Sequence, residues 1–370
     1  MSDSLQQEQQ MIADSVRRWA TQTSSPAQRE ASAAHNDGCP PERWGEIAEM
    51  GWLAFPIPAE DEGLGGSLED LCVLAEELGR ALLIEPFVAN AIVASHLMVQ
   101  TAEGALRSQW LGDLASGQKR MAFAMWEPQC EGLVMPANAT AQQTPDGFAI
   151  SGAKGLSPGL SGADALLLVA RIADDDFGLF FVNADAAGLT LGNQRLYDGR
   201  HAASLQLEKS PAKLLRKAPW AQMHVLVQSA IDRGIIAHCA ETAGAASVAL
   251  ATTIEYVKTR KQFGRSISSN QVVQHRLVDL YVEVQELKAL WRYVANEPSP
   301  GNVSALAIRC IDVARHVWEE TLQLHGAIGM TEEYELGEYL RRLALATSLY
   351  GGAAVHHERL AALSFKAGYA

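Results

Sequence analysis

A stripe of apolar residues at helical spacing constrains the fold more than any other feature of this sequence. Its members lie three and four residues apart and end before Pro298, so they share one face of a long α-helix. The stripe consists of Val273, Leu277, Leu280, Val284 and Leu287. Helical patterns also run over 225–258, 303–324 and 332–345. Long helices with such apolar faces predict an antiparallel four-helix bundle over residues 219–370.

The pattern of apolar residues changes in the middle of the chain, where the apolar runs are short and either continuous or alternating. Clusters of Gly, Pro, Asn and Asp separate five short runs there, as in antiparallel strands joined by turns. The runs cover 121–125, 148–151, 165–172, 179–182 and 204–207. Before them, helical spacing returns on both sides of a turn-rich stretch between Trp52 and Gly66. The sequence therefore predicts an α+β chain: an N-terminal helical domain (1–118), a small antiparallel β domain (119–218) and the C-terminal four-helix bundle (219–370).

Charge and composition exclude several classes of function. The chain has 30 Lys and Arg against 43 Asp and Glu, a net charge of −13, whereas binding to nucleic acid or an anionic membrane needs a clustered basic face. No apolar run reaches the roughly 18 residues of a membrane span, and the first residues lack the pattern of a signal peptide. The five cysteines lack metal-ligand spacing. We therefore expect a cytoplasmic protein with no nucleic-acid or membrane partner and no metal site.

Two short strings between the C-terminal helices could bind a ligand. The first, 259–265, places Arg260, Lys261 and Arg265 beside a glycine, where they could hold a phosphate or pyrophosphate. The alternative is that they cap a helix C-terminus, which favours the same residue types. The second string, 323–330, contains glycines that would let a ligand approach the backbone or would only reverse the chain. On pattern alone, the structural interpretation is favoured for each string.

Taken together and in order, these strings resemble the acyl-CoA dehydrogenase family of flavoproteins. The resemblance extends over almost the whole chain and is strongest at Arg260–Gly264 and Gln323–Gly329. It includes, earlier in the chain, Glu49–Leu53, Glu62–Gly66, Glu76–Arg80 and Trp126–Pro128. The family's order of helices, β domain and helical bundle agrees with the layout predicted above.

The resemblance implies that FAD binds at a subunit interface, with the flavin ring in one subunit and the ADP half held by its neighbour. The matching ADP-side positions are Arg260, Lys261, Gln262, Phe263, Asn270, Gln271, Gln323, Leu324, His325, Gly326 and Ala327. The family usually has glycine where Ala327 stands, so that one extra methyl group would crowd the adenosine. The resemblance therefore implies a largely complete ADP-binding side.

The positions expected to hold the flavin ring depart from the family pattern. Trp126 stands where the family has a threonine that bonds the flavin edge, and the Gly-Ser-Asp that follows in the family is missing. The family's Lys-x-Trp-Ile-Thr reads Lys-Gly-Leu-Ser-Pro here, so an aromatic neighbour of the flavin becomes Leu156 and Pro158 removes a backbone donor. All of these departures lie at positions that, by the resemblance, would contact the flavin half of FAD.

The catalytic base expected for the family is also missing. Members abstract the α-proton of the acyl thioester with a glutamate, and Gly351 and Gly234 occupy the two positions where the family places it. Asp232 lies close in sequence, but two steps along a helix turn its side chain through about 200°, so it would need a local shift. Glu241 and the pair His356–His357 could resemble acid–base or metal-binding groups, yet solvation or packing is the favoured interpretation.

The C-terminal strings are similar to those of the small subunits of heteromeric acyl-CoA dehydrogenases, such as the pimeloyl-CoA dehydrogenases. The likeness rests on 259–264, 274–276 and 329–334. It implies a heterotetramer in which a catalytic partner subunit supplies the flavin pocket and the base. Such a complex would oxidise an acyl-CoA, for example one with a steroid side chain or a dicarboxylate, to a 2-enoyl-CoA and pass electrons to an electron-transfer flavoprotein.

Three alternatives stay open at the level of sequence. The chain could be a self-sufficient homo-oligomeric dehydrogenase that uses Asp232 or a substrate-bound water as its base. It could be a structural or regulatory subunit that binds no cofactor, although bundle packing alone does not require Arg260 and Gln262. It could also be a flavin oxidase of the same fold.

Overall fold

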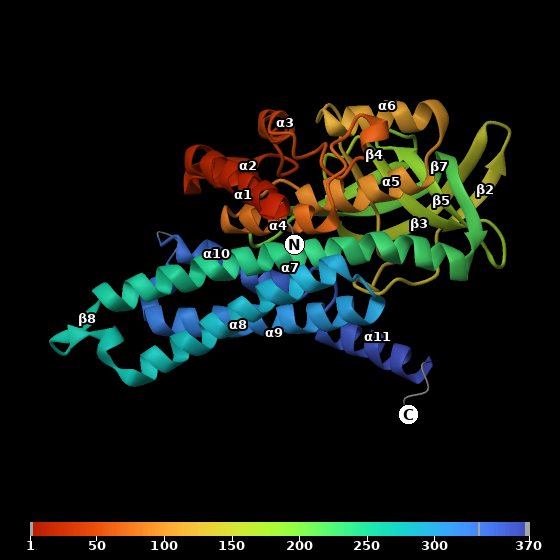
Figure 1. The fold of residues 1–370 in the computed structure, drawn as a ribbon. Helices are drawn as coiled ribbons and strands as arrows, with labels where there is room; N and C mark the ends of the chain where they lie inside the picture. The colour runs from red at the N-terminus through yellow and green to blue at the C-terminus, as the bar shows by residue number, and fades with distance from the viewer. Residues whose placement is uncertain (1–2, 332–333, 367–370) are drawn as a thin grey trace. The chain divides into compact units, whose positions relative to one another are not determined.

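The computed structural model describes residues 3–331 and 334–366, which contain N-terminal helices, a central sheet and C-terminal helices (Figure 1). The helices are α1 (Asp3–Thr23), α2 (Pro26–Ala34), α3 (Pro41–Glu49), α4 (Leu68–Arg80), α5 (Ser95–Thr101), α6 (Gly104–Ala115), α7 (Trp220–Thr259), α8 (Gln271–Asn296), α9 (Pro300–His325), α10 (Leu336–Ala346) and α11 (Ala353–Lys366). The strands are β1 (Met121–Phe123), β2 (Thr140–Thr144), β3 (Gly147–Pro158), β4 (Ala165–Arg171), β5 (Asp176–Asn183), β6 (Leu189–Arg195), β7 (His201–Pro219), β8 (Lys261–Gln262) and β9 (Arg265–Ser266). The predicted α+β fold class is confirmed.

The chain forms two compact units that are interleaved in sequence. Unit 1 comprises Met1–Gln28, Cys72–Leu83 and Ile235–Ala370, and unit 2 comprises Arg29–Leu71 and Ile84–Gly234. Helices α4 and α7 therefore each contribute to both units. The division of the chain at residues 118 and 218 stays a prediction.

The seven-stranded sheet of unit 2 is organised around β7. Along one edge β7 pairs antiparallel with β3, and along the other it pairs with β5 and then with β6. β4 is antiparallel to β5, whereas β1 lies parallel to β4, an exception to the predicted antiparallel pairing. The predicted runs lie in β1, β3, β4, β5 and β7. The sequence does not predict β2 and β6, because most of their residues are exposed and they contain no apolar run.

Alternate residues of the strands fill one core in unit 2. Leu166, Leu168, Phe180, Val182 and Leu205 are all buried in this cluster, to which β4, β5 and β7 contribute. Successive side chains of a strand point to opposite faces, so one set of alternate residues in each of these strands faces this core. Burial of large aliphatic and aromatic side chains of this kind stabilises a fold by about 1.5–3 kcal/mol each.

The apolar stripe of α8 is buried in unit 1, as the sequence predicts. Leu280 and Leu287 are fully buried, and Val284 is 1% exposed. α9 packs against α8, α10 and α11, and Figure 1 shows α7, α8 and α9 running side by side. The helix predicted over 332–345 is α10, which begins at Leu336; residues 332–333 lie outside the described residues.

Two glycines bring α4 and α7 into backbone contact in unit 1. A Cβ on Gly79 would lie 2.0 Å from the carbonyl oxygen of Glu241, and one on Gly244 would lie 1.9 Å from that of Glu76. Real side chains do not approach so closely, so only glycine allows the helices to cross at this distance. The crossing fixes where the central part of α7 lies.

α7 is the one described helix that is long and apolar enough to meet the composition test for a membrane span. Its mean hydropathy over the test window is 1.3, but 83% of that window is buried. A core helix meets the same test, and the burial of α7 accounts for its apolar sequence.

Candidate cofactor-binding site

The first ligand-binding string forms a β-hairpin that follows α7. β8 and β9 pair antiparallel, and Phe263 and Gly264 form the turn between them with φ angles of 51° and 80°. Positive φ at both turn positions is typical of a type I′ turn, which glycine adopts without strain. Phe263 adopts the same region at some cost, because left-handed backbone is unfavourable for a residue with a Cβ.

The side chains of this hairpin are directed to solvent. Arg260, Lys261 and Gln262 are exposed, and within the described part of the chain their side chains make no hydrogen bond or ion pair. Phe263 is 102% exposed. Arg260 and Lys261 form no side-chain hydrogen bond to the last carbonyl groups of α7 in the described residues, and capping by charge alone stays open. The hairpin presents two cations, an amide and an aromatic ring to an outside ligand or protein.

Asn270 and Gln271 lie next to the hairpin, at the start of α8. The side chain of Asn270 accepts a hydrogen bond from Arg265 Nη2 at 2.8 Å and donates one to the carbonyl of Ile267 at 3.1 Å, so it braces the loop. Gln271 is exposed at the first residue of α8. The N-terminus of this 26-residue helix carries partial positive charge, which favours an anion nearby.

The second string forms the end of α9 and the turn that follows it. Gly326 has φ 64° and ψ −143°, a region that only glycine occupies readily. Gln323 and Ala327 are exposed and Leu324 is half-buried. The turn therefore exposes its backbone and the methyl group of Ala327 at the end of the helix.

His325 lies at the centre of a packed cluster of rings. Its imidazole stacks on Tyr256 with the ring centroids 4.3 Å apart, and it is 4% exposed. Nδ1 donates to the carbonyl of Thr321 at 2.9 Å, so Nε2 can accept from the hydroxyl of Tyr334 at 3.3 Å. Burial lowers the pKa of His325, which keeps the ring neutral.

The ring cluster brings the two predicted strings together. Tyr256 lies on the last turns of α7, four residues before Arg260, and His325 is the last residue of α9. Their stacking holds the C-terminal end of α7, which leads into the hairpin, against the end of α9 within unit 1. Neither Tyr256 nor Tyr334 was predicted as a site residue; the only available signal was that each lies near one of the strings.

The positions expected to hold the flavin ring have their polar groups engaged within unit 2. Glu127 and Lys154, both nearly fully buried, form an ion pair, and Glu127 also accepts from the backbone N–H of Asn138 at 3.0 Å. Burial lowers the pKa of Lys154. Ser157 Oγ accepts from the backbone N–H of Met125 at 3.2 Å. These groups bond to one another rather than remaining available to a ligand.

Trp126 and the segment that follows it close this region further. Trp126 is 1% exposed, and its carbonyl accepts from the backbone N–H of Gly155 at 2.8 Å. A Cβ on Gly155 would lie 2.7 Å from Glu131 Oε1, so the segment that replaces Gly-Ser-Asp packs directly onto β3. The indole and the carboxylate therefore fill space, and neither supplies the hydroxyl group that the resemblance implies at this position.

Neither expected position of the catalytic base carries a carboxylate. Gly351 follows buried Tyr350 and has φ 97°, a conformation in which a glutamate would be strained. Gly234 lies within α7. Asp232 is 7% exposed and accepts a hydrogen bond from Gln228 Nε2 at 2.8 Å on the same helix.

The other candidate acid–base groups are packed inside unit 1. Glu241 accepts from Arg342 Nη1 at 3.0 Å and lies 3.3 Å from His238 Nδ1. His356 is 2% exposed whereas the adjacent His357 is exposed, as expected for neighbours on a helix. His238, Tyr350, Gly351 and His356 share a cavity of about 10 Å³, which holds at most one water molecule. Within the described residues no group of His, Cys, Asp and Glu is arranged to bind a metal.

Two protein-family models match the chain on both sides of the sheet. The model of the acyl-CoA dehydrogenase N-terminal domain matches residues 6–118, and the model of the acyl-CoA dehydrogenase C-terminal domain matches 224–364. Together they cover well over half of the chain. They include the helices that carry both ligand-binding strings.

Curated relatives match over nearly their full length. Acyl-CoA dehydrogenase IpdE2 of Mycobacterium tuberculosis is 27% identical over 342 residues, which cover 91% of each protein. The probable acyl-CoA dehydrogenase YngJ of Bacillus subtilis is 28% identical over 364 residues, which cover 92% of this chain and 93% of that protein.

Solved structures share the whole fold. A variant of the Tcur3481–Tcur3483 steroid ACAD superposes with a TM-score of 0.88 and 27% identity, covering 99% of this chain and 100% of that chain. The ChsE4–ChsE5 complex from Mycobacterium tuberculosis superposes with a TM-score of 0.87 at 18% identity, covering 99% of this chain and 98% of that chain. The FAD complex of PigA superposes with a TM-score of 0.87 at 19% identity, covering 100% of this chain and 98% of that chain. The matched domains, the relatives and the shared fold together show that the chain belongs to the acyl-CoA dehydrogenase family.

Proposed function

We propose that this chain is a subunit of a flavin-dependent acyl-CoA dehydrogenase that holds the ADP half of an FAD whose flavin ring and catalytic base belong to a partner subunit. One contrast carries the proposal. The side chains of Arg260, Lys261 and Gln262 are exposed and form no hydrogen bond or ion pair within the described residues. At the two positions where the catalytic base is expected, by contrast, the chain has Gly351 and Gly234. The chain is equipped for one half of an active site.

The groups around the hairpin suit an adenine dinucleotide. Arg260 and Lys261 can form charge-assisted hydrogen bonds with a pyrophosphate, and the N-terminus of α8 adds partial positive charge. Gln262 and Gln323 offer both donors and acceptors to a ribose or an adenine. Covering the exposed ring of Phe263 would stabilise the complex by roughly 2 kcal/mol.

The flavin side of this chain does not fit the ring of the cofactor. The Glu127–Lys154 pair satisfies both charges internally, and Trp126 brings bulk where a hydroxyl donor is needed. These residues therefore supply no catalytic group. A bound FAD would supply the hydride acceptor for oxidation of an acyl-CoA, with its flavin ring held by the partner subunit. This chain's part is to bind and orient the anionic half of the cofactor.

A partner surface is available on α8. Several large apolar side chains of this helix lie outside its buried stripe and are more than half exposed, and exposed apolar surface of this kind is typical of protein interfaces. They are Val272, Val278, Tyr281, Val282 and Tyr293. We propose that a catalytic acyl-CoA dehydrogenase subunit covers them in a heterotetramer. The similarity to the steroid ACAD and to the ChsE4–ChsE5 complex supports this assembly and a steroid or other bulky acyl-CoA as substrate.

Removal of one hairpin cation tests the proposal. The chain is co-purified with its catalytic partner subunit as the wild type, as Arg260→Ala and as Lys258→Ala. Arg260→Ala is expected to weaken FAD binding at least tenfold, because a charge-assisted hydrogen bond contributes about 1.5–3 kcal/mol. Lys258, two residues before Arg260, is the matched control, since on α7 it already pairs with Glu255 at 2.7 Å.

Flavin absorbance and subunit ratio of the purified complexes are the readouts. Normal flavin occupancy in Arg260→Ala would contradict the assignment of the hairpin. Yellow protein from the wild-type chain alone, with one flavin per chain, would instead support a self-sufficient enzyme. A stable complex that contains no flavin at all would support a structural subunit.

A further inference from the structure

The ring cluster of unit 1 joins segments that are far apart in the sequence. Tyr256 stacks on His325, 69 residues later, with 22° between the ring planes, and its hydroxyl group donates to the carbonyl of His325 at 3.4 Å. Tyr334 approaches the same imidazole with the ring centroids 5.3 Å apart. The imidazole therefore has one aromatic partner from α7 and another from the segment before α10.

The hairpin begins directly at this cluster. The backbone N–H of Arg260 donates to the carbonyl of Tyr256 at 2.8 Å, and the backbone N–H of Ile267 donates to the carbonyl of Arg260 at 3.0 Å. The last turn of a helix frays readily unless side chains in it are packed. Stacking of Tyr256 therefore holds the end of α7 from which the hairpin projects.

The α9 turn folds back onto the same histidine. A Cβ on Gly329 would lie 3.1 Å from the Cβ of His325 and 3.2 Å from Leu322 Cδ1, so the turn lies close against the last turn of α9. The hydroxyl group of Tyr334 lies 3.3 Å from His325 Nε2 and holds the far end of the turn. His325 therefore fixes where the exposed backbone beside it lies.

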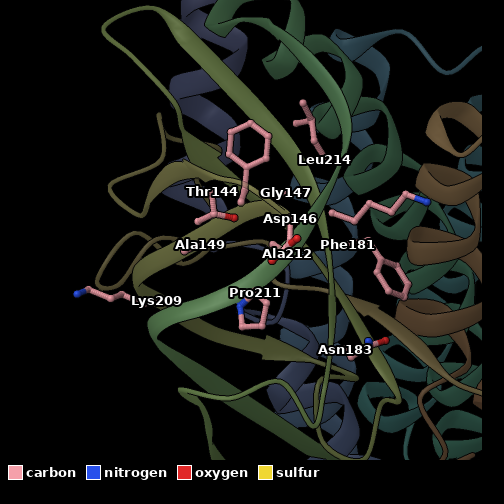
Figure 2. A pocket seen from close by; sticks show the side chains of 12 residues that line it. Thr144, Asp146, Gly147, Ala149, Phe181, Asn183, Lys209, Pro211, Ala212 and Leu214 are labelled. Carbon is pink, nitrogen blue, oxygen red and sulfur yellow. The ribbon is translucent and has the colours of Figure 1, made fainter.

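Among the described residues, the groove of unit 2 shows no such convergence of side chains. It has a volume of about 690 Å³ and lies between the β2–β3 turn, β7 and the end of β5 (Figure 2). Lys209 stands on a bulge of β7 and extends away from it. The lining of the groove identifies no ligand, whereas the contacts of the ring cluster lead to both ligand-binding strings.

We propose that Tyr256 and Tyr334 are positioning residues for the ADP half of FAD, and that both act through His325. They hold the hairpin and the α9 turn so that the cations of the one and the exposed backbone of the other can bind the same ligand. This inference rests on the proposed function, because it concerns the same site. Neither tyrosine needs to touch the cofactor.

Hydrogen exchange of the full chain, without partner or cofactor, tests the positioning itself. In Tyr256→Leu we expect at least fivefold faster exchange of the amides of residues 260–267, because the stacking that holds the end of α7 is lost. Tyr256→Phe keeps the ring and should exchange as the wild type does. Leu287→Ala is the control: this buried residue lies about 24 Å along α8 from its first residue, so the variant should lower the melting temperature without changing exchange of 260–267.

Equilibrium dialysis of the complex with the partner subunit against FAD shows whether this positioning matters to the cofactor. Tyr256→Leu and Tyr334→Leu should each weaken FAD binding about fivefold. Tyr256→Phe should restore binding to within twofold of the wild type, because the stacking carries the effect, and Leu287→Ala should stay within the same range. The double variant should lose less than the product of the two single losses, since both tyrosines act through one ring.

Four results would overturn the inference: unchanged exchange or unchanged FAD affinity in Tyr256→Leu, equal weakening of FAD binding in Leu287→Ala, no rescue by Tyr256→Phe, or a double variant that loses the full product. Arg260→Ala in the same dialysis separates this inference from the proposed function. Unchanged FAD binding in Arg260→Ala contradicts the proposed function. Weakened binding in Arg260→Ala with normal binding in Tyr256→Leu contradicts only the positioning role.

Discussion

His96 makes the stability of unit 2 depend on pH. Burial, and secondarily the charge of Arg233, lower the pKa of this imidazole from its ordinary value of 6.5 to about 4. The unfolded chain therefore binds a proton at a higher pH than the folded chain does. Its contribution to stability is complete above pH 6.5 and is lost as the pH falls toward 4.

The predicted effect is a loss of roughly 2 kcal/mol in the free energy of unfolding between pH 7.5 and 5, attributable to this residue. Urea titrations of the wild type and of His96→Gln at both pH values measure it as a difference. The variant should lose correspondingly less stability on acidification, whereas His357→Gln, an exposed control, should behave as the wild type. Equal pH dependence in all three proteins would contradict the assignment.

At the same scale, His325 shows that a sequence motif does not indicate the packing partners of its residues. The motif predicts that this residue contacts the cofactor, and that role stays a prediction. Its side chain is engaged by Thr321, Tyr256 and Tyr334 inside unit 1. The stacking partner lies 69 residues away, and nothing in the local pattern indicates that the two rings meet. The exposed hairpin cations, by contrast, could be predicted, because their charge and the adjacent Gly264 are local properties.

At the scale of elements, the crossing of α4 and α7 is intolerant of side chains. Gly244→Ala would place a Cβ 1.9 Å from the carbonyl of Glu76, so the backbones must separate. We expect a loss of about 3 kcal/mol in the free energy of unfolding, at the upper end of ordinary overpacking. Gly112→Ala is the matched control: it lies within α6 with nothing within 4 Å and should stabilise the chain by up to about 1 kcal/mol. Thermal unfolding of both variants tests this prediction. Equal melting temperatures of Gly244→Ala and Gly112→Ala would contradict it, because they would show that the helices can separate at little cost.

The elements also differ in how far the sequence predicts them. The stripe of α8 has a strong helical period because one face of the helix is buried along its length. β2 and β6 lack a period of two because most of their residues are exposed, and they are held by backbone pairing to β3 and β7. The bulge of β7 at Lys209 depends on the register of β7 with β3, which no local pattern records.

At the scale of the whole molecule, the order of helices, sheet and helices follows from the sequence, but its division into units does not. Cys72–Leu83 from the first third of the chain joins unit 1 together with the C-terminal helices. The contacts responsible include the hydrogen bond from Trp291 Nε1 to Glu76 at 3.1 Å and the ion pair of Lys288 with Glu76 at 2.9 Å. Such long-range partners are set by packing and not by periodicity.

The proposed function assigns half of an active site to this chain, and the ratio of flavin to protein in the purified complex tests this most directly. The complex of this chain with a catalytic acyl-CoA dehydrogenase subunit is isolated, its subunit ratio is measured, and its FAD is released and quantified. We predict one FAD for each pair of unlike subunits, because only the partner supplies a flavin pocket. Two FAD molecules for each such pair would show that this chain holds a flavin ring of its own and would contradict the account.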